Sequence, residues 1–272
     1  MKTILIPTDF SPAALNAAHY AVEMALSISA RLVLLHVCQI PAIYPDIPTV
    51  YTEEDMRKEA VEEMNHLKAQ LMQQADYKLA IDIEIITGLF FPVLESVCKL
   101  VEPHSVVMGC QGTTSTERFL FGGHAVHTMK QLMWPVITVP VGAVYSSVKK
   151  IGLACDFDHV INSMRMEKIK MMIKDFDAAL FVLNTGKREV FDPEIVYESG
   201  MLQEILAPIK PHFNFIDNAD TDQGILDFVE NNDIDMLVVL PKRHSFLERL
   251  IHKSHTRQLI LHSRVPVMAI HC

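Results

Sequence analysis

The chain has 272 residues, half of them hydrophobic, and a net charge of −9 at pH 7. It carries no run of lysines and arginines, so we expect neither nucleic acid nor an anionic membrane as a partner. The first apolar run is broken by Pro7 and Asp9, too early for a signal peptide, and no stretch is long enough to cross a bilayer. The five cysteines show no CxxC pairing, which is typical of free thiols in a cytoplasmic protein.

Short β-branched runs alternate with helical patterns through the first half of the chain. Thr3–Ile6 predicts a buried strand, and Ser11 followed by Pro12 predicts a helix that begins with a hydroxyl cap. The next elements are expected in this order: strand 31–37, helix 53–77, strand 81–86, helix 92–101, strand 105–108, helix 125–133 and strand 136–139. Such an alternation is typical of a doubly wound parallel sheet.

The same pattern then restarts. Lys149–Phe157 resembles Met1–Phe10, because each is a lysine-led apolar run that ends in Asp-Phe. The later strands of the two halves also match in order, and a proline precedes the final strand of each half. A duplicated unit of about 140 residues explains these matches together. The length also favours two domains, and we expect them at residues 1–142 and 149–272.

A glycine-rich segment follows the strand expected at 105–108. It reads Gly109-Cys-Gln-Gly112, then nine residues, then Gly122-Gly123 before a helix. Glycine suits places where a ligand approaches the backbone. In α/β proteins anions bind at the carboxyl ends of parallel strands, beside helix N-termini. The segment therefore favours a phosphate site, although ordinary turn chemistry explains any one of its glycines.

With this glycine spacing, the duplicated pattern and Asp9 after the first strand, the chain resembles the tandem form of the universal stress protein family. The family's nucleotide loop is Gly-x-x-Gly, nine residues, then Gly and Ser or Thr. Gly123 departs from it and removes a hydroxyl group expected to touch a phosphate. The resemblance implies two flavodoxin-like or Rossmann-like domains, each a five-stranded, mostly parallel sheet flanked by helices.

The resemblance also implies a ligand, namely an adenine nucleotide in the N-terminal domain, expected to be ATP with Mg carried by its phosphates. It places Asp9 near the adenine and ribose, and the backbone of Val37 against the adenine. The helix that begins near His124 would point its N-terminus at the anion. The full set of implied nucleotide contacts is Pro7, Thr8, Asp9, Val37, Met108, Gly109, Gly112, Gly122, Gly123 and His124. From the residues alone, Asp9 could equally cap or brace the first helix.

The corresponding segment of the second half has lost the glycines. The aligned positions are Leu240, Arg243 and Lys253, followed by Ser254. Side chains there would fill the space that a phosphate needs, so we expect nucleotide binding in the N-terminal half only. Asp156 is retained, and it could form a weak anion site with Arg243 and Ser254. A solvated or interface loop explains the basic residues of this segment as well.

Other nucleotide enzymes and metal sites fit the sequence less well. It contains neither GxxxxGK[ST] nor a GxGxxG after the first strand. His252, His255 and His262 lack an acid or cysteine that would complete a metal-ligand set. Three functions stay open: a nucleotide-binding stress regulator with little or no catalysis, a slow ATPase that uses His124 or Asp9, and a nucleotide-free scaffold for protein partners.

The final strand of each half is apolar and therefore needs a partner. An uncovered apolar edge strand is an aggregation hazard, so it must be covered or paired. The resemblance implies that strands 136–139 and 265–270 pair antiparallel, which makes the two halves a pseudo-dimer within one chain. Association of two chains into a homodimer is left open.

Overall fold

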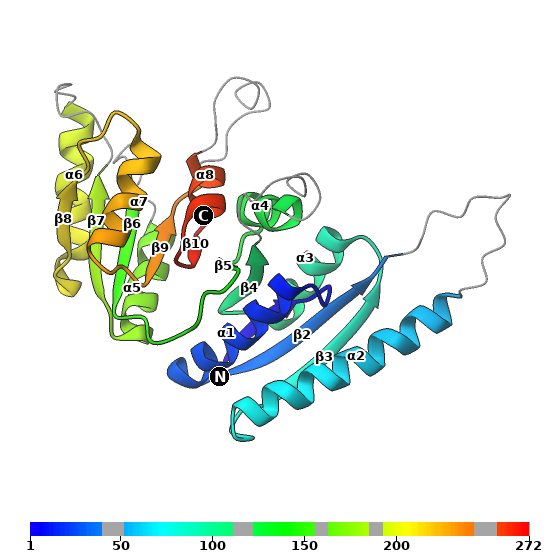
Figure 1. Ribbon diagram of the computed structural model, residues 1–272. Coiled ribbons are helices and arrows are strands. Elements are labelled where there is room, and N and C mark those ends of the chain that lie inside the picture. The colour runs from blue at the N-terminus through cyan, green and yellow to red at the C-terminus, as the bar shows by residue number, and fades with distance from the viewer. Residues whose placement is uncertain (40–51, 111–121, 156–162, 185–192, 242–254, 272) are drawn as a thin grey trace, which may run out of the picture.

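The computed structural model in Figure 1 describes residues 1–39, 52–110, 122–155, 163–184, 193–241 and 255–271. The first half contains β1 (Lys2–Pro7), α1 (Pro12–Ile28), β2 (Ala30–Cys38), α2 (Glu53–Gln74), β3 (Ile81–Thr87), α3 (Phe90–Val101), β4 (Ser105–Cys110), α4 (Gly122–Gln131) and β5 (Val136–Pro140). The second half contains β6 (Lys150–Cys155), α5 (Ser163–Phe176), β7 (Ala179–Asn184), α6 (Pro193–Leu206), the short 3₁₀ helix η1 (Ala207–Ile209), β8 (His212–Phe215), α7 (Thr221–Asn231), β9 (Met236–Val239), α8 (His255–His262) and β10 (Val267–Ala269).

The described strands form one ten-stranded sheet in the order β3-β2-β1-β4-β5-β10-β9-β6-β7-β8. Each half contributes five strands, and read from the centre outward the order is the same in both halves. All recorded neighbours are parallel except β5 and β10. The expected fold class, two tandem α/β units with mostly parallel sheets, is confirmed.

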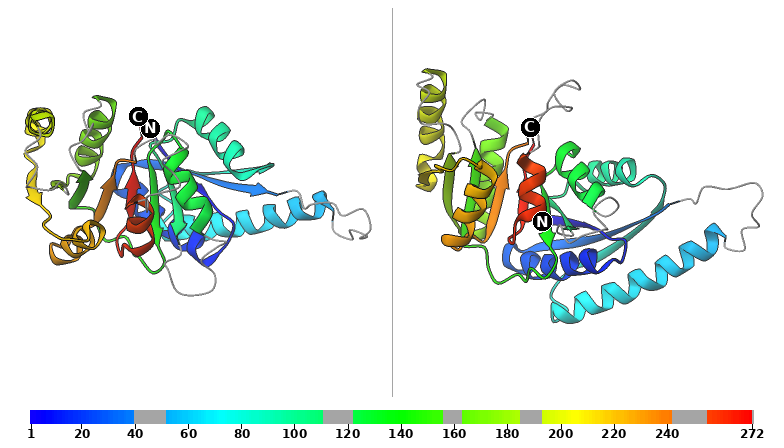
Figure 2. Two further views of the ribbon diagram at one scale, coloured as in Figure 1. Left: turned by 90° about the horizontal axis from the view of Figure 1, so that it is seen from above. Right: turned by 45° about the horizontal axis from the view of Figure 1, so that its top comes forward.

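Helices cover both faces of the sheet, and each face has a continuous hydrophobic core. The buried residues of α1, α2, α5 and α6 share one core cluster, and those of α3, α4, α7 and α8 share the other. Both clusters contain residues from both halves, so the core runs across the whole molecule. In the two views of Figure 2, β10 and α8 in red lie beside β5 and α4 in green.

Helix α1 begins as the sequence predicts. The hydroxyl oxygen of Ser11 accepts a hydrogen bond from the backbone N–H of Ala14 at 3.3 Å, and Pro12 occupies the first turn. A proline there loses no helical hydrogen bond, because the first N–H groups of a helix have no partner within it. The chain therefore turns from β1 into α1 within four residues.

The antiparallel pairing of β5 with β10 joins the two halves, as the resemblance implied. Ile137 lies opposite Met268, and Thr138 lies opposite Val267. The buried hydroxyl group of Thr138 also donates a hydrogen bond to the carbonyl oxygen of Val267 at 3.2 Å. Because β5 ends at Pro140 and β6 begins at Lys150, we keep residues 1–142 and 149–272 as the proposed domains.

Polar side chains reinforce this junction on both sides of the paired strands. The buried ring of His271 donates from Nε2 to the carbonyl oxygen of Met129 in α4 at 2.6 Å. On the α5 side, the carboxylate of Asp175 contacts Lys2 Nζ at 2.6 Å and His104 Nε2 at 2.9 Å. The Lys2–Asp175 ion pair and these hydrogen bonds thus fasten the second half to the first, in addition to the sheet.

The paired strands should be essential for stability. Ile137 is fully buried between the two halves, so Ile137→Lys places a charge in an apolar core and should lower the free energy of unfolding by more than about 3 kcal/mol. Val141→Lys is the matched control, because Val141 is 56% exposed just beyond β5 and its change should cost less than about 0.5 kcal/mol. Denaturant unfolding and limited proteolysis measure both effects, and equal stability of the two variants would contradict this role.

The junction should also weaken in acid. Burial lowers the pKa of His104 below its ordinary value of 6.5, although the Asp175 carboxylate acts in the opposite direction. The neutral ring donates from Nε2, and its buried Nδ1 has no partner among the described residues. His104 therefore binds a proton more readily in the unfolded chain than in the folded one. The contribution of the neutral ring to the free energy of unfolding is complete above pH 6.5 and is lost as the pH falls through the pKa of His104 in the folded protein.

We test this with His104→Gln, whose amide can still donate to Asp175 but does not titrate. The free energy of unfolding of the wild type should fall more steeply between pH 7.5 and 5.5 than that of the variant. Parallel curves for the two proteins would show that His104 does not contribute to the pH dependence.

Candidate functional site

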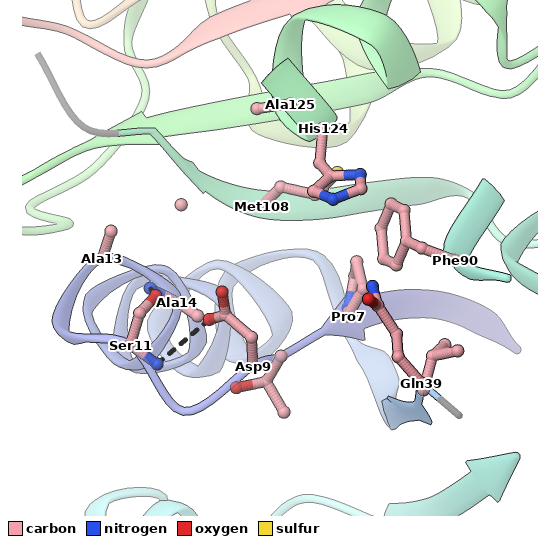
Figure 3. A pocket seen from close by; sticks show the side chains of 13 residues that line it. Pro7, Asp9, Ser11, Ala13, Ala14, Gln39, Phe90, Met108, His124 and Ala125 are labelled. Atoms are coloured by element: carbon pink, nitrogen blue, oxygen red, sulfur yellow. Dashed lines mark hydrogen bonds between the residues drawn. The ribbon is translucent and has the colours of Figure 1, made fainter. Parts of the chain in front are cut away.

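A pocket of about 240 Å³ opens at the carboxyl ends of β1, β2 and β4, beside the first turns of α1, α3 and α4 (Figure 3). The carboxyl ends of parallel strands are where open α/β sheets bind ligands. The lining residues are Pro7, Thr8, Asp9, Ser11, Ala13, Ala14, Val37, Gln39, Phe90, Met108, Gly109, His124 and Ala125.

Seven of the ten residues implicated by the sequence line this pocket: Pro7, Thr8, Asp9, Val37, Met108, Gly109 and His124. Gly122 and Gly123 begin α4, directly before the lining residue His124. Gly112 lies outside the described residues, and so do Asp156, Arg243 and Ser254 of the proposed weak anion site.

The two carboxylate oxygens of Asp9 point in different directions. Its Oδ1 accepts a hydrogen bond from the backbone N–H of Ser11 at 3.0 Å, which braces the start of α1. Its other oxygen is turned toward the pocket, on the side facing His124 (Figure 3). Asp9 is exposed. The two roles that the sequence left open for Asp9 are therefore compatible in one side chain.

The pocket combines an apolar wall with a few polar groups. The Phe90 and His124 rings meet edge to face, with centroids 4.9 Å apart and planes at 64°, and Met108 also lines the pocket (Figure 3). Asp9, Gln39 and His124 supply the longer polar side chains. A mostly apolar site with a small number of placed polar groups is typical of small-molecule pockets.

The first turn of α4 faces this pocket. α4 begins at Gly122, and the pocket-lining residues His124 and Ala125 lie within its first turn. The first N–H groups of a helix have no partner within the helix and carry partial positive charge. An anionic group that extends from the pocket along α4 would meet this end of the helix.

The reason for glycine at position 109 is different from the one that the sequence suggested. A Cβ atom built on Gly109 would overlap the carbonyl group of Ala13 and would lie 2.7 Å from the backbone nitrogen of Ala14. The missing side chain is therefore required by the packing of α1 on β4, whether or not a phosphate is present. Gly109 still lines the pocket with its backbone.

Several lining residues escaped the sequence analysis. Phe90 belongs to α3, which begins two residues before the predicted position, and Gln39 directly follows β2. Ser11, Ala13 and Ala14 come from the capped start of α1. The cap signal at Ser11 was visible in the sequence and could have placed these three at the same end of the sheet.

Cysteine chemistry and metal binding have little support in the described ranges. Cys38, Cys98, Cys110 and Cys155 are buried and form no disulfide with one another. Burial raises the pKa of the Cys98 thiol to about 12 and that of Cys110 to about 11, so both stay protonated at neutral pH. Within those ranges no three His, Cys, Asp or Glu side chains gather as metal ligands, and no helix has the length and apolar character to span a membrane.

The sequence of residues 1–140 and 207–271 matches the universal stress protein family. The chain belongs to the universal stress protein family. A universal stress protein of Synechocystis is 23% identical over 297 residues, which cover 98% of this chain and 99% of that protein. The similarity therefore extends over nearly the whole of both sequences.

A solved structure of another family member shows the same fold. A universal stress protein from Archaeoglobus fulgidus, 16% identical, covers 99% of this chain and 98% of its own with a TM-score of 0.72. A family protein from Arabidopsis thaliana was crystallised with AMP bound. It is 20% identical and covers 53% of this chain and 94% of its own, with a TM-score of 0.37. At this level of similarity, the bound AMP is a property of the Arabidopsis protein only.

Because glycine at position 109 is required by packing, a substitution there should destabilise the protein strongly even when no ligand is bound. Gly109→Ala should lower the free energy of unfolding by about 2 kcal/mol or more, because α1 must move away from β4. Gly200→Ala is the control: nothing lies within 4 Å of the added carbon, and alanine favours the helix, so we expect a gain of up to ~1 kcal/mol. Thermal unfolding of the ligand-free proteins measures both, and an unchanged Tm for Gly109→Ala would disprove the packing role.

Proposed function

We propose that this family member is a stress-response regulator that binds an adenine nucleotide, preferably ATP, in the pocket of its N-terminal half, with little or no catalysis. One observation supports this most directly. Seven residues that come from three separated strand ends and from α4 line one pocket, and they belong to the set of nucleotide contacts implied by the resemblance to the family.

The chemistry of the pocket fits the parts of a nucleotide in order. A flat base suits the apolar wall of Pro7, Val37 and Met108. Ribose hydroxyl groups are hydrogen-bond donors, and the pocket-facing oxygen of Asp9 is an acceptor for them. The phosphates would then follow the first turn of α4, past His124.

The volume of the pocket agrees with a nucleoside inside it and phosphates beyond it. Pockets for complete drug-sized ligands usually measure about 300–1,000 Å³, and the volume here is about 240 Å³. The pocket therefore suits the nucleoside, while the phosphates lie beyond it. Asp9 is the one carboxylate among the described lining residues, so we propose that Mg²⁺ is carried by the phosphates rather than by a protein cage.

Hydrolysis remains the second outcome to test. Asp9 and His124 both line the pocket, but Oδ1 of Asp9 already accepts the Ser11 N–H, and the proposal uses its other oxygen for the ribose hydroxyl groups. A general base must reach the attacking water with a lone pair that is not otherwise used. We therefore propose binding without rapid turnover, and ADP release during incubation would count against this.

Binding should be confined to the N-terminal half. Asp9→Ala removes the proposed ribose acceptor and should weaken Mg-ATP binding about tenfold or more, whereas Asp156→Ala, at the corresponding position of the second half, should not. Gly123→Ser adds back the hydroxyl group and should tighten binding by ~1.5–3 kcal/mol, roughly ten- to a hundred-fold. Titration calorimetry gives the Kd of each variant.

Arg243→Ala and Gly112→Val complete the comparison. We expect little change from Arg243→Ala and loss of binding from Gly112→Val, because a side chain would block the approach to the backbone. Loss of binding in Arg243→Ala with retention in Gly112→Val would place the site in the other half. No binding by the wild type at about 1 mM Mg-ATP would overturn the nucleotide proposal and favour the scaffold.

A further inference from the structure

The turn that carries Asp9 is held by a side chain from the neighbouring strand. His36, in β2, donates from Nδ1 to the carbonyl oxygen of Thr8 at 2.9 Å. Because that partner can only accept, the proton is on Nδ1. The backbone N–H of Thr8 donates to the carbonyl oxygen of Leu35 at 2.8 Å. Both backbone groups of Thr8 are therefore fixed by β2.

The same imidazole also supports an unfavourable backbone conformation. Phe10 has φ +61°, in the left-handed region that bulky residues rarely adopt. Its ring stacks on His36 with centroids 4.7 Å apart and planes at 28°. The hydroxyl oxygen of Thr8 accepts the backbone N–H of Phe10 at 3.1 Å. His36 thus holds the residues on both sides of Asp9.

This arrangement determines where the carboxylate of Asp9 points. With Thr8 and Phe10 fixed, Oδ1 of Asp9 meets the Ser11 N–H and the other oxygen is turned to the pocket. His36 itself is not a lining residue, although the next residue, Val37, is. Any effect of His36 on a ligand must therefore pass through the turn.

We propose that His36 is the positioning residue of this site: it holds the Thr8–Phe10 turn so that Asp9 presents a carboxylate oxygen to the ribose hydroxyl groups of the ligand. This inference rests on the proposed nucleotide function. It predicts a specific effect: changing His36 should weaken the recognition of the ribose and leave the recognition of the base and phosphates unchanged.

A ligand without these hydroxyl groups separates this role from a general structural one. ATP and 2′,3′-dideoxy-ATP differ only in the groups that Asp9 would bind. The wild type should bind ATP about tenfold or more tightly than the dideoxy compound. Asp9→Ala should bring this ratio near one, which establishes Asp9 as the group that reads the ribose.

The test of His36 uses two substitutions of different hydrogen-bonding capacity. His36→Leu removes the donor, so the affinity for ATP should fall about tenfold while the affinity for 2′,3′-dideoxy-ATP stays unchanged. His36→Asn keeps an amide donor close to the position of Nδ1 and should restore the ratio to within about threefold of the wild-type value. Circular dichroism and thermal unfolding of each variant verify that it is folded.

Each other outcome has a defined meaning. Equal weakening of both ligands by His36→Leu, or an unchanged ratio, overturns the positioning role, and so does a wild type that binds both ligands equally. If the wild type binds neither ligand, the proposed nucleotide function fails instead. Should His36→Leu not fold, His36→Phe replaces it, because a phenyl ring can still stack on Phe10 but has no donor for the carbonyl oxygen of Thr8. An unchanged ratio in His36→Phe overturns the inference as well.

Discussion

The candidate site depends on how closely the backbone of α1 approaches β4. At Gly109 no side chain fits between the strand and the first turn of the helix. This contact places the capped start of α1 over the carboxyl ends of the central strands, where the turn with Asp9 lies opposite the first turn of α4. A wider separation would move Asp9 away from the groups with which it shares the pocket. The geometry of the site is therefore set by packing before any ligand arrives.

The two halves are joined by a different kind of contact. Hydrogen bonds between β5 and β10 make the sheet continuous, and both hydrophobic cores cross this line. The charged cluster around Asp175 lies on the α5 side, and the buried bond from His271 to Met129 connects β10's end to α4. Since α4 also forms one side of the pocket, the site is built on a helix that the second half helps to hold.

Much of the fold could be predicted from the sequence, because it depends on local patterns. Apolar runs located the central strands, and Ser11 with Pro12 located the start of α1. The site was predictable only in part. Phe90 contacts His124 from a different helix, and the packing partner of Gly109 is the distant Ala13. Such contacts depend on tertiary packing, which leaves no periodic signal. The fifth strand expected in the second half, β8, was not located in the sequence for a related reason: with four residues at the edge of the sheet it is too short for a pattern to develop.

The connection of the two halves in one chain has a further consequence. When identical subunits form a symmetric pair, every substitution appears twice and every interface residue must suit both of its positions. Here the pairing of β5 with β10 takes place within one chain, so it does not depend on protein concentration. Each half can also acquire substitutions that the other does not share. One copy keeps Gly109 and Gly112, while the aligned positions of the other carry Leu240 and Arg243. Covalent linkage thus allows one half to specialise while the other maintains the shared sheet.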